Sequence, residues 1–200
     1  MPYDSEATKA RILDAAAGEF AEHGLAGARV DRIASRAQAN KQAIYAYFGD
    51  KERLFTTVLR QQLREHVDAV PVDPDDIAGY MSRLLDQQQR RPELLRLLLW
   101  EALERGDGPV PDEGERTEHY RAKVEAFGDA QRDGKVRDDI DPAALMLLLL
   151  SMAKWPFVVP QVRRMLMADD SGHERLRAAI MAAADALTRP PQSQDGEATQ

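Results

Sequence analysis

Residues 41–51 combine a glutamine, two tyrosines and two lysines with a narrow apolar stripe. Glutamine can pair with adenine through two hydrogen bonds, and tyrosine hydroxyls and lysine ammonium groups suit phosphate oxygens. On a helix, with about 100° between residues, Ile44 and Phe48 share one face, whereas Gln42 and Ala46 point the opposite way. The two apolar residues are enough to anchor a short helix. Its polar and aromatic face therefore remains available to contact DNA.

A helix-turn-helix would position this face. Apolar residues at helical spacing predict a short helix from about Val30 to Ala37, and the turn Gln38-Ala39-Asn40 follows it. Asn40 is a favoured N-cap for a second helix that ends near Phe48. In this motif the second helix enters the DNA major groove. A longer helix is predicted from about Ser5 to His23, stopped by Gly24 in a left-handed conformation, so that three helices fit within about fifty residues.

Apolar residues recur three and four positions apart along the rest of the chain, and no strand pattern persists. We therefore expect an all-α fold. Asp141 should cap the strongly apolar helix that begins at Pro142, and Pro156 and Pro160 should kink or end it. The remaining helices are predicted at about 50–69, 75–91, 92–106, 115–133 and 173–187, and a polar, proline-rich tail at 190–200 is expected to be disordered.

Charge is distributed unevenly along the 200 residues. The net charge is −7, but residues 1–60 hold nine Lys and Arg against eight Asp and Glu, whereas the remainder has a net charge of −8. The N-terminal part can therefore approach a polyanion. We expect a cytoplasmic protein, because the N-terminal residues have no signal-peptide pattern. The apolar run from Ala143 to Ala153 is about half the length of a membrane span, so we expect a buried helix and no membrane partner.

The residue pattern does not favour an enzyme. The four histidines are widely separated, and the chain has neither cysteine, nor a phosphate-binding glycine loop, nor a serine-centred elbow. We expect neither a metal site nor a cofactor. The Arg105-Gly106-Asp107 tripeptide matches an adhesion motif, but a match of only three residues arises by chance.

The run RVDRIASRAQANKQAIYAYFGDKERLF, from Arg29 to Phe55, resembles the helix-turn-helix of the tetracycline-repressor (TetR) family of transcriptional regulators. The preceding EHGLAGARV also matches, and the resemblance covers about Glu6 to Arg60. It implies a three-helix DNA-binding domain at 1–50, followed by a larger helical domain at 51–189 for dimerisation and effector binding. Family members usually carry Gly-Val-Ser where this chain has Gln38-Ala39-Asn40. Gln38 should therefore adopt the turn without the freedom of glycine, at a cost of about 1 kcal/mol.

The resemblance also implies roles for individual residues. Arg29 and Arg32, at the start of the first motif helix, would meet phosphate or a base edge. Gln42 and Ala43 would contact bases. The backbone contacts would come from Lys41, Tyr45, Tyr47 and Lys51. The alternative to these DNA contacts is that the tyrosines belong to the hydrophobic core and that the lysines are solvated surface residues.

The resemblance further implies a homodimer that binds a palindromic operator in double-stranded DNA and is released by a small-molecule effector. The helix around Ala143–Ala153 is apolar on all sides, so we expect one side to face a second copy of the chain, with burial in one monomer as the alternative.

A sensor module that does not bind specific DNA is the other function to consider. The candidates for an effector pocket are Trp100, Glu101, Tyr120, Phe127, Met146, Trp155 and Phe157, with His119 and Lys154 as further polar candidates. The alternative is ordinary packing for the aromatic and apolar residues, and a surface ion pair with Arg105 for Glu101.

Overall fold

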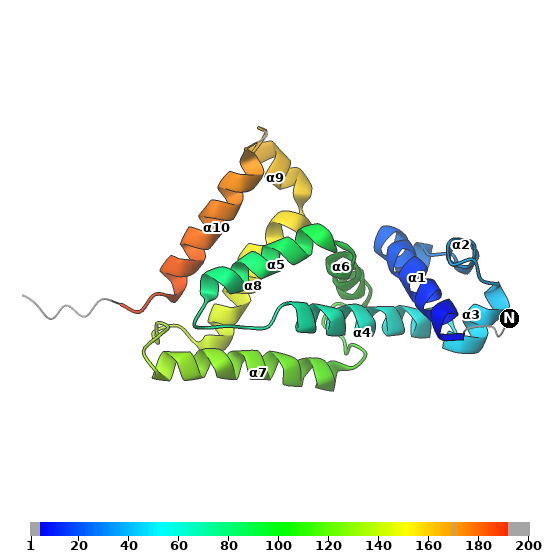
Figure 1. The fold of residues 1–200 in the computed structure, drawn as a ribbon, viewed down its shortest axis with the longest axis horizontal. Coiled ribbons are helices and arrows are strands. Elements are labelled where there is room, and N and C mark those ends of the chain that lie inside the picture. Colours follow the sequence, from blue (N-terminus) through cyan, green and yellow to red (C-terminus); the bar gives the residue numbers. More distant parts are fainter. Residues whose placement is uncertain (1–4, 170, 192–200) are drawn as a thin grey trace, which may run out of the picture. The chain divides into compact units, whose positions relative to one another are not determined.

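The computed structural model describes residues 5–169 and 171–191, and every regular element among these residues is a helix. This confirms the predicted all-α fold (Figure 1). The predicted disordered tail lies almost wholly outside the described residues. The helices are α1 (Ser5–Gly27), α2 (Val30–Arg36), α3 (Lys41–Phe48), α4 (Lys51–Ala69), α5 (Ile77–Arg90), α6 (Glu93–Arg105), α7 (Glu113–Arg132), α8 (Pro142–Val158), α9 (Pro160–Leu166) and α10 (Gly172–Thr188).

Side-chain caps begin two helices where the sequence predicts them. Asn40 Oδ1 accepts a hydrogen bond of 2.6 Å from the Ala43 N–H at the start of α3. Asp141 Oδ1 accepts one of 2.9 Å from the Ala144 N–H at the start of α8. Each cap satisfies a backbone donor that has no partner within the first helical turn.

One helix end differs from the sequence prediction, and another agrees with it at Pro160. Gly24 adopts the expected left-handed conformation with φ 68°, but helical structure resumes after this kink and α1 continues to Gly27. Pro156 lies inside α8 and does not end it. The break falls at Val159, after which Pro160 begins the separate helix α9. Proline suits this first helical position because its missing N–H would have no partner there.

The described residues form two compact units, each with its own hydrophobic core. The first comprises residues 5–69 and 87–113, and the second comprises residues 70–86, 114–169 and 171–191. The boundary therefore falls inside α5, between Asp86 and Gln87. Helix α6 belongs to the same unit as the three N-terminal helices.

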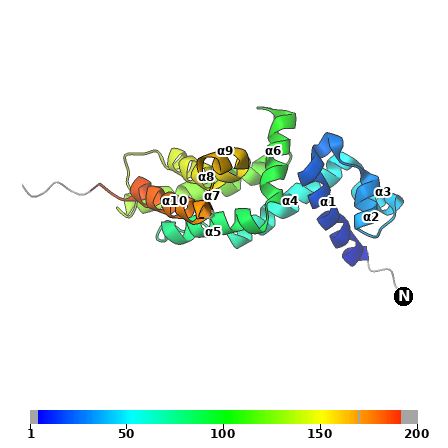
Figure 2. The ribbon, with the colours of Figure 1, turned by 90° about the horizontal axis from the view of Figure 1, so that it is seen from above.

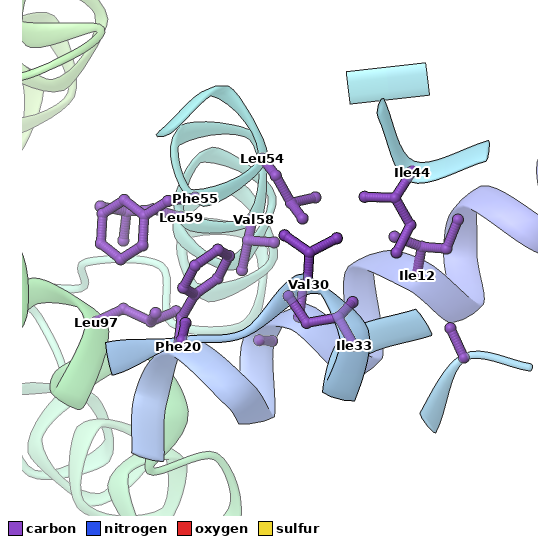
Figure 3. Close-up of a cluster of buried hydrophobic side chains, with 14 of the residues drawn as sticks. Ile12, Phe20, Val30, Ile33, Ile44, Leu54, Phe55, Val58, Leu59 and Leu97 are labelled. Carbon is purple, nitrogen blue, oxygen red and sulfur yellow. The ribbon is translucent and has the colours of Figure 1, made fainter. Parts of the chain in front are cut away.

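The core of the first unit joins α1, α2, α3, α4 and α6. Figure 3 shows Ile12 and Phe20 of α1 facing side chains of the other helices, including Ile44 of α3 and Leu97 of α6. The rings of Phe20 and Phe55 meet edge to face at 5.2 Å. Figure 2 shows α2 and α3 next to each other beside α1, as their packing requires. The buried stripe that the sequence predicts on each short helix is the one that fills this core.

The core of the second unit is formed by α5, α7, α8 and α10. Tyr80 and Phe127 are fully buried in it, and Met146 is almost so. No single described helix is long and apolar enough to span a membrane. Helices α8 and α9 together meet that criterion by length and composition, but they are bent by 84° at the break between them.

Candidate nucleic-acid interface

The turn between α2 and α3 is strained at Gln38 and is held in place by hydrogen bonds, one of them from an arginine of α1. Gln38 has φ 50°, the left-handed conformation that glycine adopts more readily. The Ala39 N–H donates to the Ala34 carbonyl at 3.0 Å, and Arg11 Nε donates to the Ala37 carbonyl at 3.1 Å. The strain predicted from the residue at position 38 is therefore present. Contacts on both sides of Gln38 keep the turn in this shape.

Helix α3 is anchored by one face, as its residue pattern predicts. Ile44 is only 2% exposed and belongs to the core of the first unit, and Phe48 is half-buried against the same core. Gln42 and Tyr45 are exposed on the other side, and Tyr45 has 44% of its surface accessible. A glutamine amide and a phenol hydroxyl thus project from a fixed helix without being required for packing.

Ala43 and Tyr47 occupy intermediate positions at the edges of this exposed face. Both are half-buried. The ring of Tyr47 packs edge to face with Phe48, with centroids 6.2 Å apart, and Lys9 Nζ lies 5.4 Å from its centroid. Tyr47 therefore helps to hold α3 against α1 as well as lying beside the exposed face. The contact of Lys9 could not be found from the sequence, because Lys9 and Tyr47 are 38 residues apart.

A buried carboxylate accepts hydrogen bonds from the backbone of Arg29 and from the side chain of Arg32. Glu19 of α1 is completely buried, and its Oε1 accepts hydrogen bonds from the Arg29 backbone N–H at 2.9 Å and from Arg32 Nε at 2.7 Å. Arg32 also donates to the Gly27 carbonyl at 3.1 Å. The Arg29 side chain is left exposed at the N-cap of α2. Arg32 is thus a structural link between α1 and α2 in addition to any contact it makes with a partner.

Hydrogen bonds keep Glu19 charged inside the protein. Burial alone would raise the pKa of this carboxyl, but the hydrogen bonds from Arg32 and from the Arg29 N–H, together with the Arg32 charge, lower it below its ordinary value. His23 and Arg36 lie 3.9 Å and 3.7 Å from Glu19 Oε2. The sequence does contain a signal for this residue, because Glu19 falls within the apolar stripe of the first helix. A carboxylate in that position needs a buried partner.

Both lysines predicted to contact DNA have partners within the chain. Lys41 Nζ pairs with Asp31 at 2.9 Å on the exposed surface. Lys51 Nζ lies 3.3 Å from the Ala26 and Ala28 carbonyl oxygens and closes the loop between α1 and α2. An ammonium group has three N–H donors, so these two carbonyls leave one donor of Lys51 for a phosphate.

Two protein-family models match the sequence of this chain. Residues 12–58 match the family model described as bacterial regulatory proteins, tetR family, and residues 76–185 match the model described as tetracyclin repressor-like, C-terminal domain. The second match alone covers more than half of the chain. The chain belongs to the TetR family. TetR-family proteins are DNA-binding transcriptional regulators, which confirms the resemblance and the function class predicted from residues 29–55.

Individual members of the TetR family align over most of the chain. The HTH-type transcriptional repressor SCO4008 of Streptomyces coelicolor is 53% identical over 182 residues, which are 90% of this chain and 95% of that protein. The HTH-type transcriptional repressor NicS of Pseudomonas putida is 29% identical over 74% of each chain. The crystal structure of the transcriptional regulator SCO4942 of Streptomyces coelicolor has a TM-score of 0.81 and 33% identity, over 92% of this chain and 99% of that one.

The residues predicted to line a TetR effector pocket are divided between the two compact units. Trp100 and Glu101 lie on α6 in the first unit, and the other five lie in the second. The Trp100 indole N–H donates to the Ala21 carbonyl at 3.3 Å, and its ring lies so close to Gly24 that a Cβ there would be 2.8 Å from it. Trp100 therefore packs against the helix-turn-helix domain. Glu101 is buried beside it on the same helix.

The five residues in the second unit differ in exposure. Phe127 and Met146 are core residues, whereas Tyr120 and Trp155 are 42% and 60% exposed. Phe157 is half-buried, with the Arg163 guanidinium 5.7 Å from its ring centroid. The structure thus places two of the predicted residues inside the unit and two on its surface. None of the seven lines the two open grooves beside α1 and α4, which have volumes of about 660 and 460 Å³.

No group of three or more His, Cys, Asp or Glu side chains that could hold a metal ion occurs among residues 5–169 and 171–191.

Proposed function

We propose that this protein is a homodimeric repressor that binds a palindromic operator through α2 and α3 and leaves it when a small molecule binds the helical C-terminal domain. The observation that carries the proposal is the exposed face of α3, which a buried Ile44 and a capped N-terminus hold rigid in a TetR-family protein. We assign DNA binding to residues 1–50 and effector binding and dimerisation to 51–189. Such a protein acts where its DNA is, in the cytoplasm.

Gln42 and Ala43 are assigned to the bases. Gln42 is exposed near the N-terminus of α3, the end of a recognition helix that reaches base edges. Its amide can pair with adenine, and the small Ala43 allows close approach or contact with a thymine methyl group. Base contacts supply specificity, because each wrong base leaves a donor or acceptor unpaired.

The residues around Gln42 are assigned to the DNA backbone. Tyr45 presents an exposed hydroxyl, and Arg29 presents a guanidinium from the N-terminus of α2. Lys41 would exchange its exposed ion pair with Asp31 for a phosphate, at little cost because exposed ion pairs contribute less than about 1 kcal/mol. Arg32 and Tyr47 support these contacts from half-buried positions, and Lys51 offers its remaining N–H.

Dimerisation is supported by an apolar surface on α8 and α10, which pack against each other. Leu147 and Trp155 of α8 are 65% and 60% exposed, and Leu148 lies beside them. Ala179 and Ala182 of α10 are also exposed, and residues this small allow a second helix to approach closely. Pairing of these faces across a two-fold axis would bury them in a four-helix bundle. A two-fold dimer then matches a palindrome with half-sites about one helical turn apart.

Release requires that a change in the second unit reaches the first. Helix α5 crosses the unit boundary, so a displacement of its N-terminal part acts through the chain on the segment that leads into α6. Helix α6 is tied to α1 by Arg96 Nε and Trp100 Nε1, which both donate to the Ala21 carbonyl, at 2.6 and 3.3 Å. An effector shifts the equilibrium only by its difference in affinity for the DNA-bound and free conformations.

DNA binding to the region upstream of the protein's own coding sequence tests the proposal. We expect the purified protein to bind one palindromic fragment in preference to random DNA of equal length, with an affinity that falls as salt rises. A sensor module without specific DNA binding would show no such preference. Sequencing of the genomic fragments retained by the protein identifies the operator if it lies elsewhere.

A further inference from the structure

We propose that the effector is a small aromatic carboxylate and that the ammonium groups of Lys123 on α7 and Lys154 on α8 bind its anionic group. This inference rests on the proposed function, because it names the chemical class of the effector. The argument comes from two lysines of the second unit that have no ion-pair partner among the described residues, and from buried donors of the same unit whose acceptors are weak or missing.

Lys123 is a buried cation without a counterion. Only 5% of its surface is exposed, although lysine is among the residue types least often buried. It forms no hydrogen bond or ion pair with any residue in the described part of the chain. An unpaired charge inside a protein is costly unless something compensates it. The compensation must come from a group outside the described residues or from loss of the proton.

A second lysine increases this local positive charge. Lys154 is half-buried and likewise has no ion-pair partner among the residues that the structure describes. Burial, and the nearby charge of Lys154, lower the pKa of Lys123 to about 8, and burial lowers the pKa of Lys154 below its ordinary value. Most Lys123 side chains therefore still carry the proton at pH 7. Loss of the proton does not solve the problem, and a bound anion would.

The neighbouring polar groups are donors without strong acceptors. Tyr80 is completely buried, and its hydroxyl points to Met146 Sδ at 3.8 Å, which is a weak acceptor. Burial raises the pKa of Tyr80 to about 12, so the phenol keeps its proton and can donate it to a hydrogen bond. Arg83 Nε, one turn further along α5, is also buried without an acceptor in the described structure, although Nη1 of the same guanidinium lies 3.8 Å from Asp76 Oδ2. His119, one turn before Lys123 on α7, has its pKa lowered by burial and by Lys123, so the imidazole is neutral.

This combination of donors selects for a ligand that carries acceptors and negative charge. A cation would be repelled by both lysines, and a neutral ligand would leave their charge uncompensated. A carboxylate provides up to four acceptor positions for the two ammonium groups. Phe127 lies one turn after Lys123 on α7 and is fully buried, and Met146 is buried opposite it in the same core. These side chains favour an apolar, aromatic body for the ligand.

Three probes with the same ring and different charge test the inference. Benzoate, benzamide and benzamidine carry charges of about −1, 0 and +1 at pH 7, as expected for a carboxylate, an amide and an amidinium group. We would measure their binding to the full-length protein by calorimetry and by the shift in melting temperature, at low salt. Benzoate should bind and raise the melting temperature at millimolar concentration. The inference is overturned if benzoate does not bind, or if benzamide or benzamidine binds equally well.

Two variants and a control locate the bound probe. Lys123→Met and Lys154→Met should each weaken benzoate binding by about tenfold or more, because each removes one charged donor. Lys135→Met removes an exposed lysine of the same unit, which pairs with Asp75 at 2.7 Å, and should leave benzoate binding unchanged. Without ligand, Lys123→Met should also unfold at a higher temperature than the original protein, since it removes an uncompensated buried charge. Equal benzoate affinity for all four proteins would overturn the inference.

The same proteins separate this inference from the proposed function. Operator binding in the absence of benzoate should be unchanged in Lys123→Met, because the substituted side chain lies outside the DNA-binding helices. If the original protein fails to bind any operator, the proposed function is wrong, while binding of benzoate to the free protein is still decided by calorimetry. If the operator is bound but benzoate is not, only the effector class is wrong.

Discussion

The Glu19 carboxylate accepts a hydrogen bond of 2.7 Å from Arg32 Nε, deep between the first two helices of the DNA-binding domain. The same oxygen accepts the backbone N–H of Arg29, the residue that precedes α2. One buried carboxylate on α1 therefore fixes both the start of α2 and an arginine side chain in its first turn. Because α2 and α3 are joined by a tight turn, Glu19 also determines where the recognition helix lies.

Replacement of Glu19 by glutamine tests this link. Glutamine preserves size and an acceptor oxygen but loses the charge that Arg32 requires. We expect Glu19→Gln to lower the free energy of unfolding by about 1–3 kcal/mol. Glu22→Gln is the matched control, since Glu22 lies on the same helix with an exposed side chain and should change stability by less than about 0.5 kcal/mol. Urea denaturation that gave the two variants equal stability would contradict a structural role for Glu19.

The lowered pKa of Glu19 predicts how stability depends on pH. A carboxyl whose pKa is lower in the folded state contributes stability above its unfolded value of about 4.3, and this contribution is lost as pH falls through the folded value. Below about pH 4.3, acidification should therefore destabilise the original protein more steeply than Glu19→Gln. Melting temperatures measured between neutral and acidic pH check this. Parallel curves for the two proteins would show that Glu19 does not contribute.

The strained turn residue offers a substitution that should stabilise the protein. Gln38 has φ 50°, where glycine has no steric penalty. We expect Gln38→Gly to raise the free energy of unfolding by up to about 1 kcal/mol. Ala39→Gly, at the next position without a positive φ, should lower it instead. A stabilising effect of both substitutions, or of neither, in chemical denaturation would contradict the strain assigned to Gln38.

These residues also show what a sequence can and cannot predict. The caps at Asn40 and Asp141 depend on neighbours within four positions, so their residue types are enough, whereas the strain at Gln38 is predicted from the glycine that family members carry there. The apolar spacing of Ile44 and Phe48 likewise predicts which face of α3 is buried. Partners far apart in the chain are different: Lys51 binds carbonyls 23 and 25 residues away, and Trp100 packs against Gly24. No local pattern specifies such pairs, so the contact between Trp100 and Gly24 is found only in the structure.

The proposed dimer predicts the effect of a charge on the exposed face of α8. Leu147→Glu should convert the dimer to a monomer, because an unpaired carboxylate would be buried at the centre of the interface. Ala122→Glu places the same charge on an exposed position of α7 and should leave the dimer intact. Sedimentation velocity distinguishes the two species. A Leu147→Glu protein that stays dimeric would exclude α8 from the interface.

The central claim is that the exposed face of α3 reads DNA sequence, and Gln42 tests it most directly. The measurement is the affinity of Gln42→Ala for the operator and for random DNA of the same length, by fluorescence anisotropy at one salt concentration. We predict a loss of about 1–3 kcal/mol on the operator and almost none on random DNA, because a base contact is removed while phosphate contacts remain. Lys51→Met, the backbone control, should weaken binding to both by similar factors. Equal losses on the two DNAs for Gln42→Ala would contradict the claim.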